Sequence, residues 1–80
     1  QRISFNYNNI PLRVVLQDLS VKYHFNFIFD DILVDNISVT FKAVNEYPSS
    51  AIKKMSKLYQ FNCEFITANT IIISRTKQKE

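Results

Sequence analysis

The sequence predicts a small α+β domain in which a β-α-β unit occurs twice and is followed by one more strand. The first observation is a repeat: residues 19–29 (LSVKYHFNFIF) return as residues 55–65 (MSKLYQFNCEF), an offset of 36, with five of the eleven positions identical. A repeat of this length is typical of a supersecondary unit that buries its apolar face against a copy of itself. The second observation is that apolar and polar residues alternate before and after each predicted helix, as they do in half-buried strands.

The first unit opens with a strand and a helix. The inward-facing residues of the strand are Ile3, Phe5 and Tyr7. We expect Asn8-Asn9 to end this strand, and Pro11 to occupy the first helical position, where its missing N–H costs nothing. The apolar face of the helix consists of Leu12, Val15, Leu16, Leu19 and Tyr23. The helix should end near His24, because strand alternation resumes immediately afterwards.

The strand after this helix alternates through Phe25, Phe27 and Phe29. We expect residues 30–36 (DDILVDN) to form a connection to the second unit, with Ile32 and Leu33 tucked against the core.

The second unit repeats this order. Its opening strand carries Ile37, Val39 and Phe41, which align with the first strand at an offset of 34 and so place a slip of two residues in a loop at 42–46. Pro48 starts the second helix, whose predicted apolar face is Ala51, Ile52, Met55, Leu58 and Tyr59. The next strand carries Phe61, Cys63 and Phe65. Ala68-Asn69 suits a hairpin turn, since Asn tolerates positive φ, and residues 70–74 form the closing strand. The predicted order is therefore β-α-β-β-α-β-β.

The chain contains no glycine, although glycine is the preferred residue where a helix ends in a left-handed conformation. His24 and Gln60 occupy the two equivalent helix ends. Either these ends avoid positive φ, or each residue adopts it at a cost of about 1–2 kcal/mol.

Length and composition predict one globular domain over residues 1–74, with residues 75–80 as the start of a linker to a following domain. The 80 residues are 46% hydrophobic with a net charge of +3, which excludes a disordered chain. No apolar run approaches the roughly 18 residues of a membrane-spanning helix, so we expect the chain as given to be soluble. It carries no secretory signal, and Gln1 suits a mature end left after cleavage.

Residues for catalysis or for cofactor binding are missing from the sequence. One His and one Cys cannot supply the three or four ligands of a zinc site, and a phosphate-binding loop needs glycine. Asp30 and Asp31 are adjacent and would point to opposite sides of an extended chain. We therefore expect no enzyme, no metal and no cofactor. An RNA-binding module is a remote alternative, because residues 37–42 (ISVTFK) have one aromatic residue and lack the glycine of the RNA-binding signature.

Taken as a whole, the doubled pattern resembles the STN domain, the short domain at the N-terminus of secretins and TonB-dependent proteins. The matching segments are Pro11-Leu12 with Val15-Leu16 and Leu19, then Phe25–Asp30, Ile37–Val39, Ala51-Ile52 and Asn69–Ile73. The sequence departs from the family at His24 and Gln60, where glycine is common. The resemblance implies two helices sandwiched between a two-stranded and a three-stranded sheet, in a periplasmic domain of an outer-membrane protein.

The same resemblance implies a function in protein interaction. The first interpretation is the signalling domain of a TonB-dependent outer-membrane receptor, which relays ligand occupancy to the periplasmic domain of an inner-membrane anti-sigma regulator. Gln1 directly before the first strand favours this interpretation. The alternatives are a ring domain of a secretin and the C-terminal periplasmic domain of the regulator itself. The residues after Glu80 would discriminate: a plug and barrel selects the receptor, and further small periplasmic domains select the secretin. We expect the isolated domain to be a monomer and to bind no nucleic acid.

Six residues are candidates for partner binding. They are Arg13, Val14, Gln17 and Val21 on the first helix, and Lys53 and Lys57 on the second. Val14 and Val21 are seven residues apart and stack on the helix side opposite its apolar face. Either the second sheet covers these valines, or they belong to an exposed docking stripe flanked by Arg13, Gln17 and His24. Lys53 and Lys57 are expected to be exposed and to meet an acidic patch on a partner.

Overall fold

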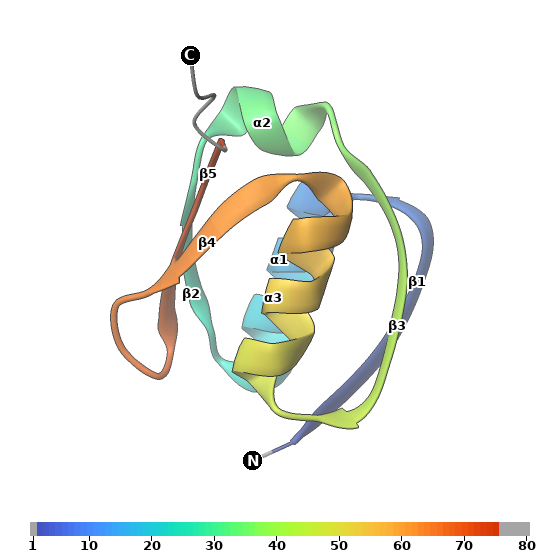
Figure 1. The fold of residues 1–80 in the computed structure, drawn as a ribbon, viewed down its shortest axis with the longest axis vertical. Helices are drawn as coiled ribbons and strands as arrows, with labels where there is room; N and C mark the ends of the chain where they lie inside the picture. The colour runs from blue at the N-terminus through green and yellow to red at the C-terminus, as the bar shows by residue number, and fades with distance from the viewer. Residues whose placement is uncertain (1, 76–80) are drawn as a thin grey trace.

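The computed structural model describes residues 2–75 as an α+β domain in which two helices lie between two sheets (Figure 1). The elements in chain order are β1 (Ile3–Pro11), α1 (Leu12–Tyr23), β2 (Asn26–Phe29), α2 (Asp31–Asp35), β3 (Ser38–Glu46), α3 (Pro48–Tyr59), β4 (Phe61–Phe65) and β5 (Thr70–Arg75). The predicted fold class is confirmed. None of the helices in the described part of the chain has the length and apolar character needed to cross a membrane.

The two sheets differ in strand number and direction. β1 and β3 pair antiparallel as a two-stranded sheet. The other sheet has the order β2-β5-β4, in which β5 runs parallel to β2 and antiparallel to β4. α1 and α3 fill the space between the sheets, and α2 lies at one end of the molecule (Figure 1). β2 and β4 are therefore the two edges of the three-stranded sheet.

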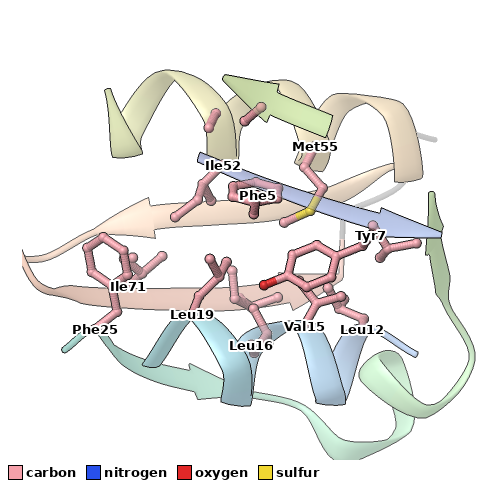
Figure 2. Packing of buried hydrophobic residues seen from close by; sticks show 14 of the residues in the cluster. Phe5, Tyr7, Leu12, Val15, Leu16, Leu19, Phe25, Ile52, Met55 and Ile71 are labelled. Atoms are coloured by element: carbon pink, nitrogen blue, oxygen red, sulfur yellow. The ribbon is translucent and has the colours of Figure 1, made fainter. Parts of the chain in front are cut away.

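The hydrophobic core contains residues from both sheets and from the helices between them (Figure 2). Its helical residues are Leu12, Val15, Leu16 and Leu19 from α1, and Ala51, Ile52 and Met55 from α3. β1 contributes Ile3, Phe5 and Tyr7, and β5 contributes Ile71 and Ile73. Phe25 and Phe61, the first residues after each helix end, are both buried, as the repeat predicts.

The internal repeat has an offset of 36 residues throughout, which corrects the offset of 34 expected for the opening strands. Tyr23 Oη contacts the backbone of Ser4, and Tyr59 Oη contacts the backbone of Thr40, so both pairs are 19 residues apart. Ile3 is thus equivalent to Val39, and both are buried. A slip of two leaves strand alternation unchanged, so apolar pattern alone could not discriminate between the two offsets.

Two β-bulges explain why β1 and β3 are longer than expected. Asn8-Asn9 does not end β1, and residues 42–46 belong to β3 rather than to a loop. In the strand register, Thr40 lies opposite Asn8 and Asn9, and Ser4 lies opposite Val44 and Asn45. The second asparagine of each bulge has positive φ, 55° at Asn9 and 52° at Asn45. Asparagine tolerates this conformation, so the strand bends without glycine.

Each bulge is held by reciprocal hydrogen bonds. The N–H of Asn9 donates to Thr40 Oγ1 at 3.0 Å, and the N–H of Asn45 donates to Ser4 Oγ at 2.8 Å. In each bulge, the residue that lies opposite two residues of the partner strand forms backbone hydrogen bonds with a tyrosine. Tyr23 Oη donates to the Ser4 carbonyl and accepts from the Ser4 N–H, and Tyr59 Oη does the same with Thr40. The tyrosines therefore bind the C-terminal end of each helix to the two-stranded sheet.

Both helix ends adopt the left-handed conformation, which resolves the alternative left open by the absence of glycine. His24 has a φ of 62° and Gln60 a φ of 60°. The backbone N–H of each cap residue closes the last turn by donating to the carbonyl of Ser20 or of Ser56.

Several local expectations are wrong. Residues 31–35 form the helix α2, capped by the Asp30 carboxylate, which accepts from the Ile32 N–H at 2.9 Å. Ile32 is 63% exposed, and Val34 is buried in its place. Leu58 is 58% exposed, and the buried face of α3 includes Ser56 instead.

The boundaries of two elements also differ from expectation. Pro11 precedes the first helical turn as the N-cap and is the last residue of β1. β5 continues to Arg75, whose guanidinium lies 3.5 Å from the Asp30 carboxylate. The rest of the predicted linker, residues 76–80, lies outside the described residues.

Candidate functional site

The outer side of α1 is an exposed stripe in which Val14, Gln17 and Val21 follow one another at helical spacing. Val14 is 46% exposed and Val21 is 76% exposed, and Gln17 between them is also exposed. At 100° per residue, Val14 and Val21 lie about 150° and about 170° from the centre of the buried face of α1, and their exposure shows that neither sheet covers them. The expectation that the second sheet covers them is therefore wrong. The docking stripe remains as the alternative.

Arg13 is fixed at the side of this stripe by α2. Its Nη2 lies 3.0 Å from Asp31 Oδ1 and its Nε lies 2.9 Å from Asp35 Oδ1. The guanidinium also stands over the Phe29 ring, 5.7 Å from its centre. The hydrogen bond from Arg13 lowers the pKa of Asp35 and, in turn, the carboxylates raise the pKa of Arg13. Much of the charge of Arg13 is thus matched within the domain, and we assign it the role of holding α2 against α1.

A groove runs between α1 and β2. Its volume is about 340 Å³, and its walls include Gln17, Ser20 and Val21 from the helix with Asn26, Phe27 and Phe29 from the strand. β2 pairs only with β5, so the strand beside this groove is an edge of the sheet. The groove brings two predicted partner-binding residues, Gln17 and Val21, together with strand residues that were not among the six candidates. Sequence alternation marks Phe27 as inward-facing but cannot show that a groove opens above it.

Lys53 and Lys57 are exposed, as expected, but they do not join the α1 stripe. They line a second groove, of about 560 Å³, between α3 and β4. The six predicted residues are therefore divided between two surfaces. His24 is also exposed, and its left-handed backbone ends α1 as the C-cap residue.

A partly buried polar contact between Tyr7 and Asp18 also joins β1 to α1. Tyr7 Oη donates to Asp18 Oδ2 at 2.6 Å, and Lys22 Nζ lies 3.3 Å from the same oxygen. Burial, reinforced by this hydrogen bond, raises the pKa of Tyr7 well above its usual range. The hydrogen bond from Tyr7 lowers the pKa of Asp18, with help from Lys22. The contact connects the middle of α1 to β1 and gives the Asp18 carboxylate two partners, Tyr7 and Lys22.

In a comparison with known protein families, the family described as "FecR, C-terminal" matches residues 4–73, which is most of the chain. This chain belongs to the FecR C-terminal family. The predicted connection with cell-surface signalling is supported, but the matching family is the FecR C-terminal family and not the STN family. The match favours the regulator alternative over the receptor interpretation.

A solved structure shares the fold. It is the crystal structure of a protein proposed to be an anti-sigma factor, from Parabacteroides distasonis. The two chains superpose with a TM-score of 0.77 at 14% sequence identity, over 95% of this chain and 35% of the other. This chain therefore corresponds to about a third of the length of that protein. No curated protein sequence matches it.

Proposed function

We propose that this chain is the C-terminal periplasmic domain of an inner-membrane anti-sigma regulator, and that it binds the STN-type signalling domain of a TonB-dependent outer-membrane receptor. The observation that carries the proposal is the FecR C-terminal family match over residues 4–73. The structural similarity to a protein proposed to be an anti-sigma factor supports the same assignment. The domain acts by binding and performs no catalysis.

We assign receptor binding to the α1 face. Val14 and Val21 are large apolar side chains that are exposed on a helix whose other side is buried in the core. Exposed apolar residues that gather on one element are typical of protein interfaces. The groove beside them contains half-buried aromatic residues, Phe27 and Phe29, and aromatic residues are enriched among those that dominate binding energy.

The test is a direct binding measurement by isothermal titration calorimetry. This chain is titrated with the purified STN-type signalling domain of each TonB-dependent receptor of the same organism. We expect one of these domains to bind, and we expect Val21→Asp to weaken that binding by about tenfold or more, because it places a charge in an apolar contact. The matched control is Val44→Asp, at an exposed valine on β3. It should leave the affinity unchanged.

Each alternative predicts a different result. If the chain is instead the signalling domain of a receptor, it will bind the periplasmic domain of a regulator and none of the STN-type domains. If it is a secretin domain, it will assemble into rings at high concentration. Absence of binding to every STN-type domain at about 0.1 mM overturns the proposed function. Equal weakening by Val21→Asp and Val44→Asp overturns the assignment to the α1 face.

A further inference from the structure

The internal repeat gives the domain two equivalent grooves, one on each edge of the three-stranded sheet. The first lies between α1 and β2, and the second lies between α3 and β4. Five residues that line the first groove have a counterpart 36 positions later that lines the second. These pairs are Gln17 and Lys53, Ser20 and Ser56, Val21 and Lys57, Asn26 and Asn62, and Phe27 and Cys63. The two grooves thus share one backbone design.

The side chains of the two grooves have diverged in charge and in size. The helix positions that carry Gln17 and Val21 in the first groove carry Lys53 and Lys57 in the second. The second groove is larger, about 560 Å³ against about 340 Å³, and it has a cysteine where the first has a phenylalanine. Its lining contains two lysines and no acidic residue.

Neither lysine has an acidic partner among the described residues. Across residues 2–75, the lysines in ion pairs are Lys22 with Asp18 and Lys54 with Glu46, and neither Lys53 nor Lys57 forms one. Glu64 of β4 is not among the residues that line the groove. The groove therefore presents an unmatched positive charge.

The strand beside these lysines is open to pairing. β4 pairs antiparallel with β5 along one side, and it is the terminal strand of the sheet. An edge strand presents backbone N–H and C=O groups to which an extended chain can add. Phe61 and Cys63 provide an apolar base for side chains of such a chain, and the lysines stand above them on α3.

We propose that the α3–β4 groove binds an acidic extended segment of another protein, which adds as a strand to β4 and pairs its carboxylates with Lys53 and Lys57. The positive charge of the groove favours an acidic segment over a second copy of this chain. A second copy of this chain would bring two more lysines to the same groove, and the chain has a net charge of +3, so self-pairing is opposed by repulsion. This groove is separate from the α1 face, and the proposal does not rest on receptor binding.

The probe is a short fluorescent peptide of alternating Glu and Val, and its binding to this chain is measured by fluorescence anisotropy at low salt. We expect it to bind about tenfold more tightly than the same peptide with Gln in place of Glu, and to weaken as salt is added. Lys53→Glu with Lys57→Glu should abolish this preference. The matched control, Arg2→Glu with Lys42→Glu, changes the net charge equally outside the groove, at exposed cations that form no ion pair with a described residue, and should have little effect.

Strand addition and self-pairing are tested separately. A Glu-Val peptide that is N-methylated at every backbone amide has no N–H to donate to an edge strand, so it should lose binding. Analytical ultracentrifugation should show a monomer. The proposal is overturned if the Glu peptide does not bind at about 1 mM, if both double variants weaken binding equally, if N-methylation has no effect, or if the chain forms a dimer that depends on β4. Val21→Asp should leave peptide binding unchanged, so this proposal and the proposed function can fail independently.

Discussion

Replacing Tyr23 or Tyr59 with phenylalanine tests whether the two halves of the domain are structurally equivalent. Each hydroxyl donates one hydrogen bond and accepts another at the backbone of a single residue inside a β-bulge, Ser4 or Thr40. The donated bonds are 2.8 Å and 3.0 Å long, and the accepted bonds are 3.2 Å and 2.6 Å long. Tyr→Phe removes both bonds and leaves the ring in place.

The expected loss follows from the exposure of these groups. A hydrogen bond contributes about 0.5–1.5 kcal/mol net, and Ser4 and Thr40 are exposed enough for water to replace the lost partner. We therefore expect a loss of about 1 kcal/mol in the free energy of unfolding for each substitution. In a domain of this size, about 1 kcal/mol lowers the melting temperature by about 4–8 °C. The two tyrosines share no hydrogen-bond partner, so the double variant should lose about twice as much.

Thermal and urea unfolding followed by circular dichroism measure these losses. The control is Tyr47→Phe, because Tyr47 is exposed and its hydroxyl accepts a long hydrogen bond of 3.4 Å from Arg2. It should change stability by less than about 0.5 kcal/mol. If Tyr23→Phe and Tyr59→Phe match this control, the bulges do not depend on the tyrosines. If the two losses differ by more than about 1 kcal/mol, the halves are not equivalent.

Three further predictions concern stability. Phe61→Ala should cost about 3–5 kcal/mol because it empties a buried site, enough to unfold so small a domain, and a cooperative melt close to that of the unmodified chain would contradict this. Phe25→Ala, at the equivalent buried position, should cost a similar amount, and a melt near the unmodified value would show that the second site is not equivalent. The pKa of Asp18 is lowered in the folded chain, so the contribution of its carboxylate to stability is present above the usual pKa of 3.8 and is lost as the pH falls through the lowered pKa. The stability difference between the unmodified chain and Asp18→Asn in urea unfolding should therefore be larger at neutral pH than in acid, and an equal difference would show that the charged carboxylate does not stabilise the fold.

The sequence predicted the order of the main elements because its strongest signals are local. Pro48 starts α3 and His24 ends α1 as expected, since proline and the change of periodicity act within a few residues. The bulges were missed for a different reason. Asn8-Asn9 is typical of a strand end, and only the partner strand shows that pairing resumes at Ile10. α2 was missed because five residues are too few to establish a helical period.

The candidate surfaces could be predicted in part. Helical spacing alone places Val14 and Val21 on one side of α1, but whether a sheet covers that side depends on where β2 and β5 pair. The grooves could not be predicted, because each is formed by a helix and the edge strand that follows it. The same limitation explains Leu58, whose apolar character predicts burial although it lies outside the contact between α3 and the sheets.

The central claim is that the α1 face of this domain binds the STN-type signalling domain of a receptor. The most direct test is to titrate the ¹⁵N-labelled chain with the unlabelled signalling domain and to follow its backbone amide signals by NMR. The account predicts that the largest changes fall on α1 around Val14, Gln17 and Val21 and on β2 beside the groove. Changes confined to β1 and β3, with the α1 signals unmoved at saturation, would contradict it.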